Sequence, residues 1–230
     1  MEDGSAMIKV LYEDNHLLGV EKPINVPVNE DASCDEDLLS LSKEYIRVKY
    51  QKPGNVYLGL VHRLDRPVGG VVIFARTSKA ASRLSDMIRT SRMKKTYLAV
   101  LDGVSEKKSD TLVDYLRKDH RTNMVTVTDE VHGKRSVLHY EVLAVKENKT
   151  LVKIHLETGR SHQIRVQFAS RGLPLVHDHR YNPDPKDGQI ALWAYRLEFP
   201  HPVTKEPVVL TSTPPDSGVW KLFEEYYAEN

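Results

Sequence analysis

Two short polar clusters interrupt apolar stretches of this sequence, and they carry the side chains most suited to chemistry. The first is HRLDR (residues 62–66), which follows an apolar run at 58–61, and the second is TGRSHQIR (residues 158–165). A carboxylate beside arginines stays ionised, because a nearby opposite charge favours the charged form. Asp65 is therefore a candidate nucleophile or base. A structural arginine–carboxylate pair that closes a loop would produce the same pattern, and both interpretations remain open.

Metal and nucleotide chemistry find weaker support. His62 with Asp65, or His177-Asp178-His179, could supply metal ligands, but adjacent ligands rarely converge on one ion. The single cysteine, Cys34, excludes a cysteine-based zinc cage and an intrachain disulfide. The sequence has no GxxxxGK[ST] phosphate loop, no GxGxxG motif after a strand and no GxSxG elbow. We expect neither a metal nor an organic cofactor.

Charge is distributed unevenly along the chain. The net charge is +1, yet the first 37 residues carry −8, which leaves +9 for the remainder. Basic residues gather between positions 83 and 95 and again between 160 and 180. These stretches could form a face that meets phosphates, or they could be two solvated surface segments.

The elements that must position the two clusters follow from periodicity and turn signals. Helices are expected at 35–50, 77–88 and 160–171. Strands are expected at 8–12, 17–21, 58–61, 71–75, 96–101, 137–145, 151–156, 190–199 and 208–211. Pro67 and Gly69-Gly70 predict an irregular turn after the first cluster. Hairpins dominate, so we expect an α+β protein with a mixed, mainly antiparallel central sheet and flanking helices and loops.

The stretch from 104 to 133 is polar and gives the least decisive signal. We expect a mobile insertion there, with one strand at 124–128.

Length and composition predict one catalytic domain over residues 1–230, with residues 1–6 as a flexible tail. Apolar runs are too short to cross a membrane. The acidic start is unlike a signal or transit peptide, so we expect a cytoplasmic protein. We also expect a monomer without an obligate protein partner.

Four motifs together resemble the RluA-type pseudouridine synthases, which isomerise uridine in RNA. HRLD (62–65), followed by Gly70 and Ala75, resembles the active-site motif of that family. A second motif of the family resembles KTYLA (95–99) with Gly103. A third resembles GRSHQIR (159–165) together with Gly172, Pro174, Leu175, Asp178 and Tyr181. PHPVT (200–204) resembles the closing strand. The resemblance spans residues 8–214 and implies the pseudouridine synthase fold.

The resemblance implies a role for each matching residue. Asp65 would be the nucleophile, Arg165 its orienting partner and Tyr97 the aromatic residue that stacks on uracil. Arg63 would displace and hold the everted nucleotide. Further substrate contacts would come from His62, Arg160, His162 and Gln163, and RNA backbone contacts from Arg89, Arg92, Lys94 and Lys95. An ordinary role as a core tyrosine remains open for Tyr97.

The sequence also departs from the family pattern. Pro67-Val68-Gly69 stands where a Thr-Ser pair is frequent, His177 where glycine usually precedes the aspartate, and Trp193 where histidine is common. None removes a residue that the reaction needs, but Val68, Gly69 and His177 leave open which RNA is selected. The small RNA-binding module that precedes many relatives is not expected here.

We therefore expect an RNA pseudouridine synthase that acts on specific uridines in structured ribosomal or transfer RNA, with an aspartate nucleophile and base flipping. Its partner would be RNA, with no membrane association. Two alternatives remain: a catalytically silent RNA-binding protein on the same fold, and a metal-dependent phosphoesterase.

Overall fold

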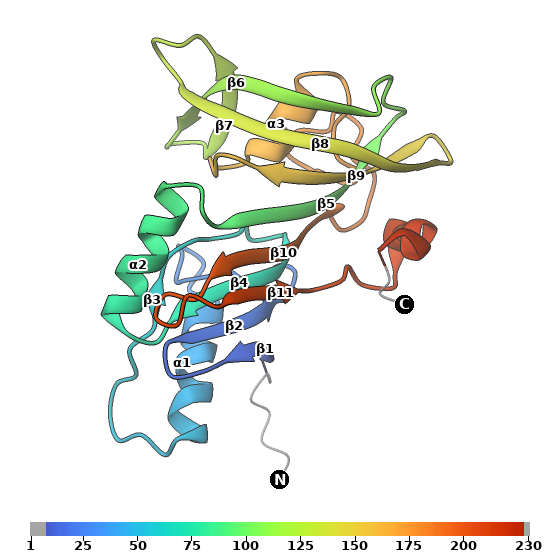
Figure 1. The fold of residues 1–230 in the computed structure, drawn as a ribbon. Helices are drawn as coiled ribbons and strands as arrows, with labels where there is room; N and C mark the ends of the chain where they lie inside the picture. The colour runs from blue at the N-terminus through green and yellow to red at the C-terminus, as the bar shows by residue number, and fades with distance from the viewer. Residues whose placement is uncertain (1–7, 228–230) are drawn as a thin grey trace. The chain divides into compact units, whose positions relative to one another are not determined.

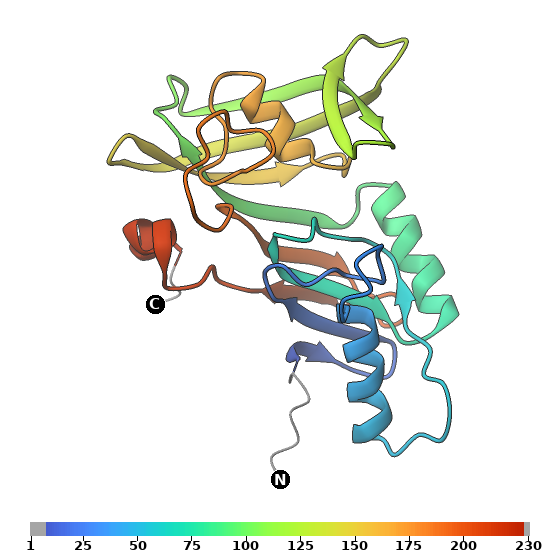
Figure 2. The same cartoon turned by 180° about the vertical axis from the view of Figure 1, so that it is seen from behind.

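The computed structural model describes residues 8–227, which form two compact units. Unit 1 contains the chain up to Met93 together with Arg196–Ser212, and unit 2 contains Lys94–Tyr195 together with the chain from Thr213 onward. Strand β10 (Leu192–Pro200) carries the chain from unit 2 into unit 1. Each unit has its own strands and helices (Figures 1 and 2). The predicted tail at residues 1–6 lies outside the described residues, and the single catalytic domain stays a prediction.

Unit 1 is built on antiparallel strand pairs. Strand β2 (Leu17–Lys22) pairs with β1 (Lys9–Glu13) on one side and β4 (Gly69–Ala75) on the other. The short strand β3 (Gly59–Leu60) also pairs with β4, and β11 (Pro207–Thr211) pairs with the 196–200 part of β10. These pairings place the chain between β3 and β4, which carries Asp65, beside the end of β2.

Strand β4 is buried along its whole length because both of its faces are covered. Val71, Ile73 and Ala75 point into a core cluster shared with helix α2 (Ser78–Arg89). Val72 and Phe74, one residue out of phase, point into a second cluster shared with helix α1 (Leu38–Lys49). The alternation of a strand thus explains why the run is apolar without interruption. Figure 2 shows α1 lying across the strands of unit 1.

The two helices of unit 1 begin at capping side chains. The carboxylate of Asp37 accepts a hydrogen bond from the backbone N–H of Ser40, and the hydroxyl of Thr77 accepts one from Ala80. Each bond satisfies an amide that has no partner within the first turn of its helix. The start of α1 fixes the end of the acidic loop that follows β2.

Unit 2 is an antiparallel sheet in the order β5 (Lys94–Asp102), β9 (Lys149–Leu156), β8 (Lys134–Lys146), β6 (Ser109–Asp119) and β7 (Met124–Thr128). Helix α3 (Gln163–Ala169) lies on one face of this sheet, as Figure 2 shows. The ring of Phe168 on α3 meets Tyr140 on β8 edge-on, with 5.2 Å between ring centroids. The 3-10 helix η1 (Gly218–Tyr226) adds Trp220 and Phe223 to the core around Leu98.

The α+β class with a mainly antiparallel sheet is confirmed, and three local expectations need correction. Strand β4 begins at Gly69, because Gly70 pairs with Lys22 and adopts a φ of 119° that side chains rarely allow. The stretch 104–133 forms the hairpin of β6 and β7 rather than an insertion with one strand. Helix α3 is shorter than expected, because residues 158–162 form a turn before it. The helix η1 was not expected.

Candidate active site

Asp65 lies in unit 1 on a turn between β3 and β4. The backbone N–H of Val68 donates to the carbonyl of Asp65 at 2.9 Å and closes the turn, called here the Asp65 turn (residues 65–68). Val68 is buried, Leu64 packs against the core cluster of α1, and Asp65 itself is half-buried. Apolar neighbours on both sides therefore hold the turn against the core.

His62 and Arg63 precede Asp65 and take different environments. The Nε2 atom of His62 accepts the backbone N–H of Ile73 on β4 at 3.0 Å, so this nitrogen is unprotonated and binds the sheet. Arg63 is exposed. Substrate contacts for both residues stay predictions, and the contact of His62 with Ile73 gives that residue a structural role as well.

Lys22, at the end of β2, was not expected to belong to the site. Its side chain is fully buried, and Nζ donates to the carbonyl oxygens of Pro23 at 2.9 Å, Val26 at 2.5 Å and Arg66 at 2.8 Å. Burial lowers the pKa of Lys22 to about 7, and the Asp65 carboxylate acts in the opposite direction. The one signal in the sequence is a lysine that ends an apolar strand directly before a proline.

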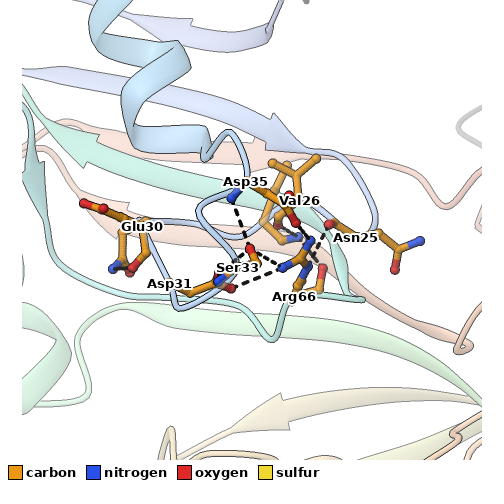
Figure 3. A network of polar contacts seen from close by, with 9 residues as sticks. Asn25, Val26, Glu30, Asp31, Ser33, Asp35 and Arg66 are labelled. Carbon is orange, nitrogen blue, oxygen red and sulfur yellow. Dashed lines mark hydrogen bonds and ion pairs between the residues drawn. The ribbon is translucent and has the colours of Figure 1, made fainter.

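Arg66 ties the Asp65 turn to the loop that follows β2 (Figure 3). Its Nε donates to the carbonyl of Asn25 at 3.1 Å, and its Nη1 donates to the hydroxyl of Ser33 at 2.9 Å. Ion pairs join Nη1 to Asp31 at 3.4 Å and Nη2 to Asp35. Hydrogen bonding to Asp35 raises the pKa of Arg66, and the same bond lowers the pKa of the Asp35 carboxyl.

In unit 2, Tyr97 lies on β5 opposite Ile154 of β9. Lys95 and Tyr97 are half-buried, whereas Thr96 and Leu98 are buried. Because side chains alternate between the two faces of a strand, Lys95 and Tyr97 share one face of β5. Burial lowers the pKa of Lys95. The face that carries a phenol and a partly desolvated ammonium is the polar face of β5.

Arg165 is held rigidly on α3. Its Nε and Nη2 donate to the two carboxylate oxygens of Asp178 at 2.9 and 2.8 Å, and both side chains are almost wholly buried. The guanidinium also lies over the ring of Tyr181, 5.2 Å from its centroid. A planar fork of this kind matches a carboxylate in a way that lysine would not. The sequence did not identify Asp178 as the partner of Arg165.

The turn before α3 is organised by Gln163. Its amide oxygen accepts from the hydroxyl of Thr158 at 2.8 Å and from the backbone N–H of Arg160 at 3.0 Å, while its amide nitrogen donates to the carbonyl of Val137 at 3.0 Å. The side chain of Gln163 is buried, so these contacts hold the turn. Arg160 is exposed, and its Nε donates to the carbonyl of Arg135 at 3.3 Å.

His162 adopts a left-handed φ of 52° directly before α3. Its Nδ1 lies 2.6 Å from the hydroxyl of Tyr181, which also accepts the backbone N–H of Val125 at 3.0 Å. Through these two contacts Tyr181 links the imidazole of His162 to strand β7. Substrate contacts for Arg160, His162 and Gln163 stay predictions.

The predicted RNA backbone residues are surface residues with unequal surroundings. Arg89 and Arg92 both pair with Asp86, each at 2.5 Å, so one carboxylate offsets one of the two charges. Lys94 is exposed and Lys95 half-buried at the start of β5.

The structure thus gathers the first polar cluster on one turn of unit 1 and the second on one turn of unit 2. Asp65 belongs to unit 1, whereas Tyr97 and Arg165 belong to unit 2, so the pairing of Asp65 with Arg165 stays a prediction. Within residues 8–227 no three His, Cys, Asp or Glu side chains gather as a metal site would require. No helix in that same range is both long and apolar enough to cross a membrane.

The chain is similar in sequence and in fold to known proteins. The family described as RNA pseudouridylate synthase matches residues 16–170. The uncharacterized RNA pseudouridine synthase YhcT of Bacillus subtilis is 32% identical over 225 residues, which are 96% of this chain and 73% of that protein. Ribosomal large subunit pseudouridine synthase C of Escherichia coli is 31% identical, over 94% of this chain and 69% of that protein.

One relative is considerably longer than this chain. The match to ribosomal large subunit pseudouridine synthase D of Nitrosomonas europaea, at 34% identity, covers 91% of this chain but 62% of that protein.

Solved structures share the fold. The structure of human RNA pseudouridylate synthase domain containing 4 superposes with a TM-score of 0.76 at 20% identity, over 90% of this chain and 88% of that one. Human RNA pseudouridylate synthase domain containing 1 gives 0.73 at 21% identity, over 100% and 98%. With a family match over most of the chain and relatives above 30% identity, the chain belongs to the RluA-type RNA pseudouridylate synthases.

Proposed function

We propose that this protein isomerises uridine to pseudouridine in structured RNA, with Asp65 as the nucleophile. The observation that carries the proposal is the position of Asp65 within HRLD, half-buried on the turn between β3 and β4, in a chain of this family. The reaction breaks the glycosidic carbon–nitrogen bond, rotates the bound uracil and joins its carbon 5 to the sugar. No atoms enter or leave. A carboxylate suits this chemistry because it can add covalently and then depart.

The remaining residues act around the nucleophile. Tyr97 stacks on the uracil, Arg165 orients the Asp65 carboxylate, and Arg63 displaces and holds the everted nucleotide. The bidentate bond between Arg165 and Asp178 supports the role of Arg165, because it fixes the guanidinium before substrate arrives. Eversion costs a few kcal/mol of unstacking, which binding to the RNA backbone must offset.

The substrate is structured ribosomal or transfer RNA, recognised mainly by shape. The names of several relatives, which specify the ribosomal large subunit, favour large-subunit ribosomal RNA as the first RNA to test. Arg89, Arg92, Lys94 and Lys95 hold its phosphates. We also propose that the protein is a monomer and acts in the cytoplasm.

The test is Asp65→Asn, which keeps the shape of the side chain and removes its charge. We expect pseudouridine formation to fall by at least about a thousandfold while RNA affinity stays within about twofold. Asp110→Asn, on β6 where the carboxylate pairs with the exposed Lys107, is the matched control and should retain the wild-type rate. Quantification of pseudouridine by mass spectrometry in RNA treated with each variant decides the matter.

Substantial turnover by Asp65→Asn would remove Asp65 from the nucleophile role. A wild-type protein that binds the RNA but forms no pseudouridine would instead favour the catalytically silent RNA-binding protein.

A further inference from the structure

The Asp65 turn is fixed from two sides through the residue that follows the nucleophile. The carbonyl of Arg66 accepts a hydrogen bond from the buried Lys22 at 2.8 Å, and the turn is closed by the bond from Val68 to Asp65. The side chain of Arg66 extends away from the turn to the loop after β2 (Figure 3). A single residue thus connects the nucleophile to two other segments of unit 1.

The loop that receives Arg66 is itself organised. The Oδ1 atom of Asp31 accepts from both the backbone N–H and the hydroxyl of Ser33, at 2.9 and 2.5 Å, and the hydroxyl of Ser33 accepts the N–H of Asp35 at 3.1 Å. Its ends are joined to β2 and to α1, where Asp37 caps the helix. The loop is therefore an anchor built on a strand and a helix.

Arg66 is poorly placed to bind RNA phosphate. Each of its three guanidinium nitrogens donates to the loop: Nε to Asn25, Nη1 to Ser33 and Asp31, and Nη2 to Asp35. The surrounding residues 29–37 carry a net charge of −5, which repels a phosphate backbone. The pairing of Arg66 is thus directed inward, to the protein.

The geometry points to Arg66 as a positioning residue, which clamps the Asp65 turn to the loop at residues 25–35 and so sets the direction of the nucleophile. This inference rests on the proposed function. The clamp is solvent-accessible, and exposed ion pairs contribute little to the stability of a fold. Its effect is therefore expected in the rate rather than in the folding of the protein, because small displacements of a reacting group are costly.

The test compares Arg66→Ala, Arg66→Lys and the double variant Asp31→Asn/Asp35→Asn with the wild type. We expect Arg66→Ala to lower the single-turnover rate at saturating RNA at least about tenfold, with RNA affinity and thermal midpoint nearly unchanged. Arg66→Lys should recover part of the rate, because one ammonium replaces part of the fork. The double variant should lose rate too, and adding Arg66→Ala to it should cost little more, because both changes break one interaction.

Arg47→Ala is the matched control. Arg47 makes a comparable exposed bidentate pair with Glu44 on α1, away from the Asp65 turn, so its removal should leave the rate unchanged. If instead Arg66→Ala weakens RNA binding at an unchanged rate, and the double variant binds RNA more tightly, Arg66 is a phosphate contact and the inference is wrong. An unchanged rate and affinity in all Arg66 variants would also overturn it.

Amide hydrogen exchange gives a readout that does not depend on catalysis. Arg66→Ala should accelerate exchange at the N–H of Val68, which closes the Asp65 turn, whereas Arg47→Ala should not. Unchanged exchange at Val68 would refute the clamp even if the protein modifies RNA. If the wild type forms no pseudouridine but Arg66→Ala still accelerates exchange at Val68, the proposed function is wrong and the clamp remains in place.

Discussion

The buried ammonium of Lys22 shows how a single side chain can link strand, loop and nucleophile. Three carbonyl oxygens from two segments surround its Nζ, and the Asp65 carboxylate interacts with it electrostatically. Buried charges are retained only where such partners offset the loss of water. Lys22 therefore belongs to the framework under the Asp65 turn.

Lys22→Met should change the pH dependence of stability. Burial lowers the pKa of Lys22 from 10.5 to about 7 in the folded protein, so between these values the unfolded chain binds more protons than the folded one. The lysine then makes the free energy of unfolding rise with pH in this window, by at most about 1.4 kcal/mol per pH unit. The wild type should gain stability relative to Lys22→Met between pH 7 and 9, as measured by urea denaturation.

The control for this experiment is Lys9→Met. Lys9 on β1 pairs with Glu21 on β2, and the side chain of Lys9 is 64% exposed, so its removal should leave the pH slope unchanged. Equal slopes for the wild type and Lys22→Met would show that Lys22 keeps its ordinary pKa.

Arg165→Ala tests a second buried charge. It leaves Asp178 wholly buried without its counter-charge, a change that typically costs about 3 to 5 kcal/mol. If Arg165 also orients Asp65, turnover at saturating RNA should collapse even at temperatures where circular dichroism shows a folded variant, with a modest loss of RNA affinity. A variant that loses only affinity would make Arg165 a phosphate clamp.

At the scale of elements, the end of helix α2 gathers basic side chains around one acid. Arg89 in the last turn and Arg92 beyond it share Asp86, so the local surface keeps a net positive charge. Exposed charges of this kind contribute to RNA affinity without reading sequence.

Arg92→Ala and Asp86→Ala should have opposite effects on RNA binding. Arg92→Ala removes one phosphate contact, which should weaken binding and reduce the slope of log affinity against log salt by about one unit. Asp86→Ala releases both arginines and should tighten binding. Turnover at saturating RNA should stay near the wild-type value in both variants. Binding curves at several salt concentrations measure the slopes, and a change of the same sign in both would exclude this surface as the RNA contact.

At the scale of the whole molecule, no three His, Cys, Asp or Glu side chains among the described residues form a group that could hold a metal ion. Because the proposed reaction uses the Asp65 carboxylate as the nucleophile, we expect purified protein dialysed against chelator to retain its rate on RNA that is folded beforehand. Activity restored only by a divalent ion, with the fold of the RNA shown to be unchanged, would support the phosphoesterase alternative. The measurement is pseudouridine formed per enzyme with and without chelator.

Local sequence determined much of the fold because the signals are short-range. The helices predicted at 35–50 and 77–88 and the strand predicted at 71–75 lie near the observed α1, α2 and β4, because periodicity and capping act within a few residues. The family was likewise evident from four motifs, because HRLD and GRSHQIR are specific in type and spacing.

Only the tertiary structure decided which groups the buried and functional side chains contact. Arg165 and Asp178 are 13 residues apart, and Lys22 and Arg66 are 44 apart, so no periodicity connects them. The polar stretch at 104–133 has only a weak strand signal in its own sequence. It forms strands because β6 pairs with β8, a contact between distant segments of the chain. Sequence thus determined which residues could do the chemistry, whereas packing decided which carbonyls and carboxylates hold them, because those contacts exist only once distant segments are brought together.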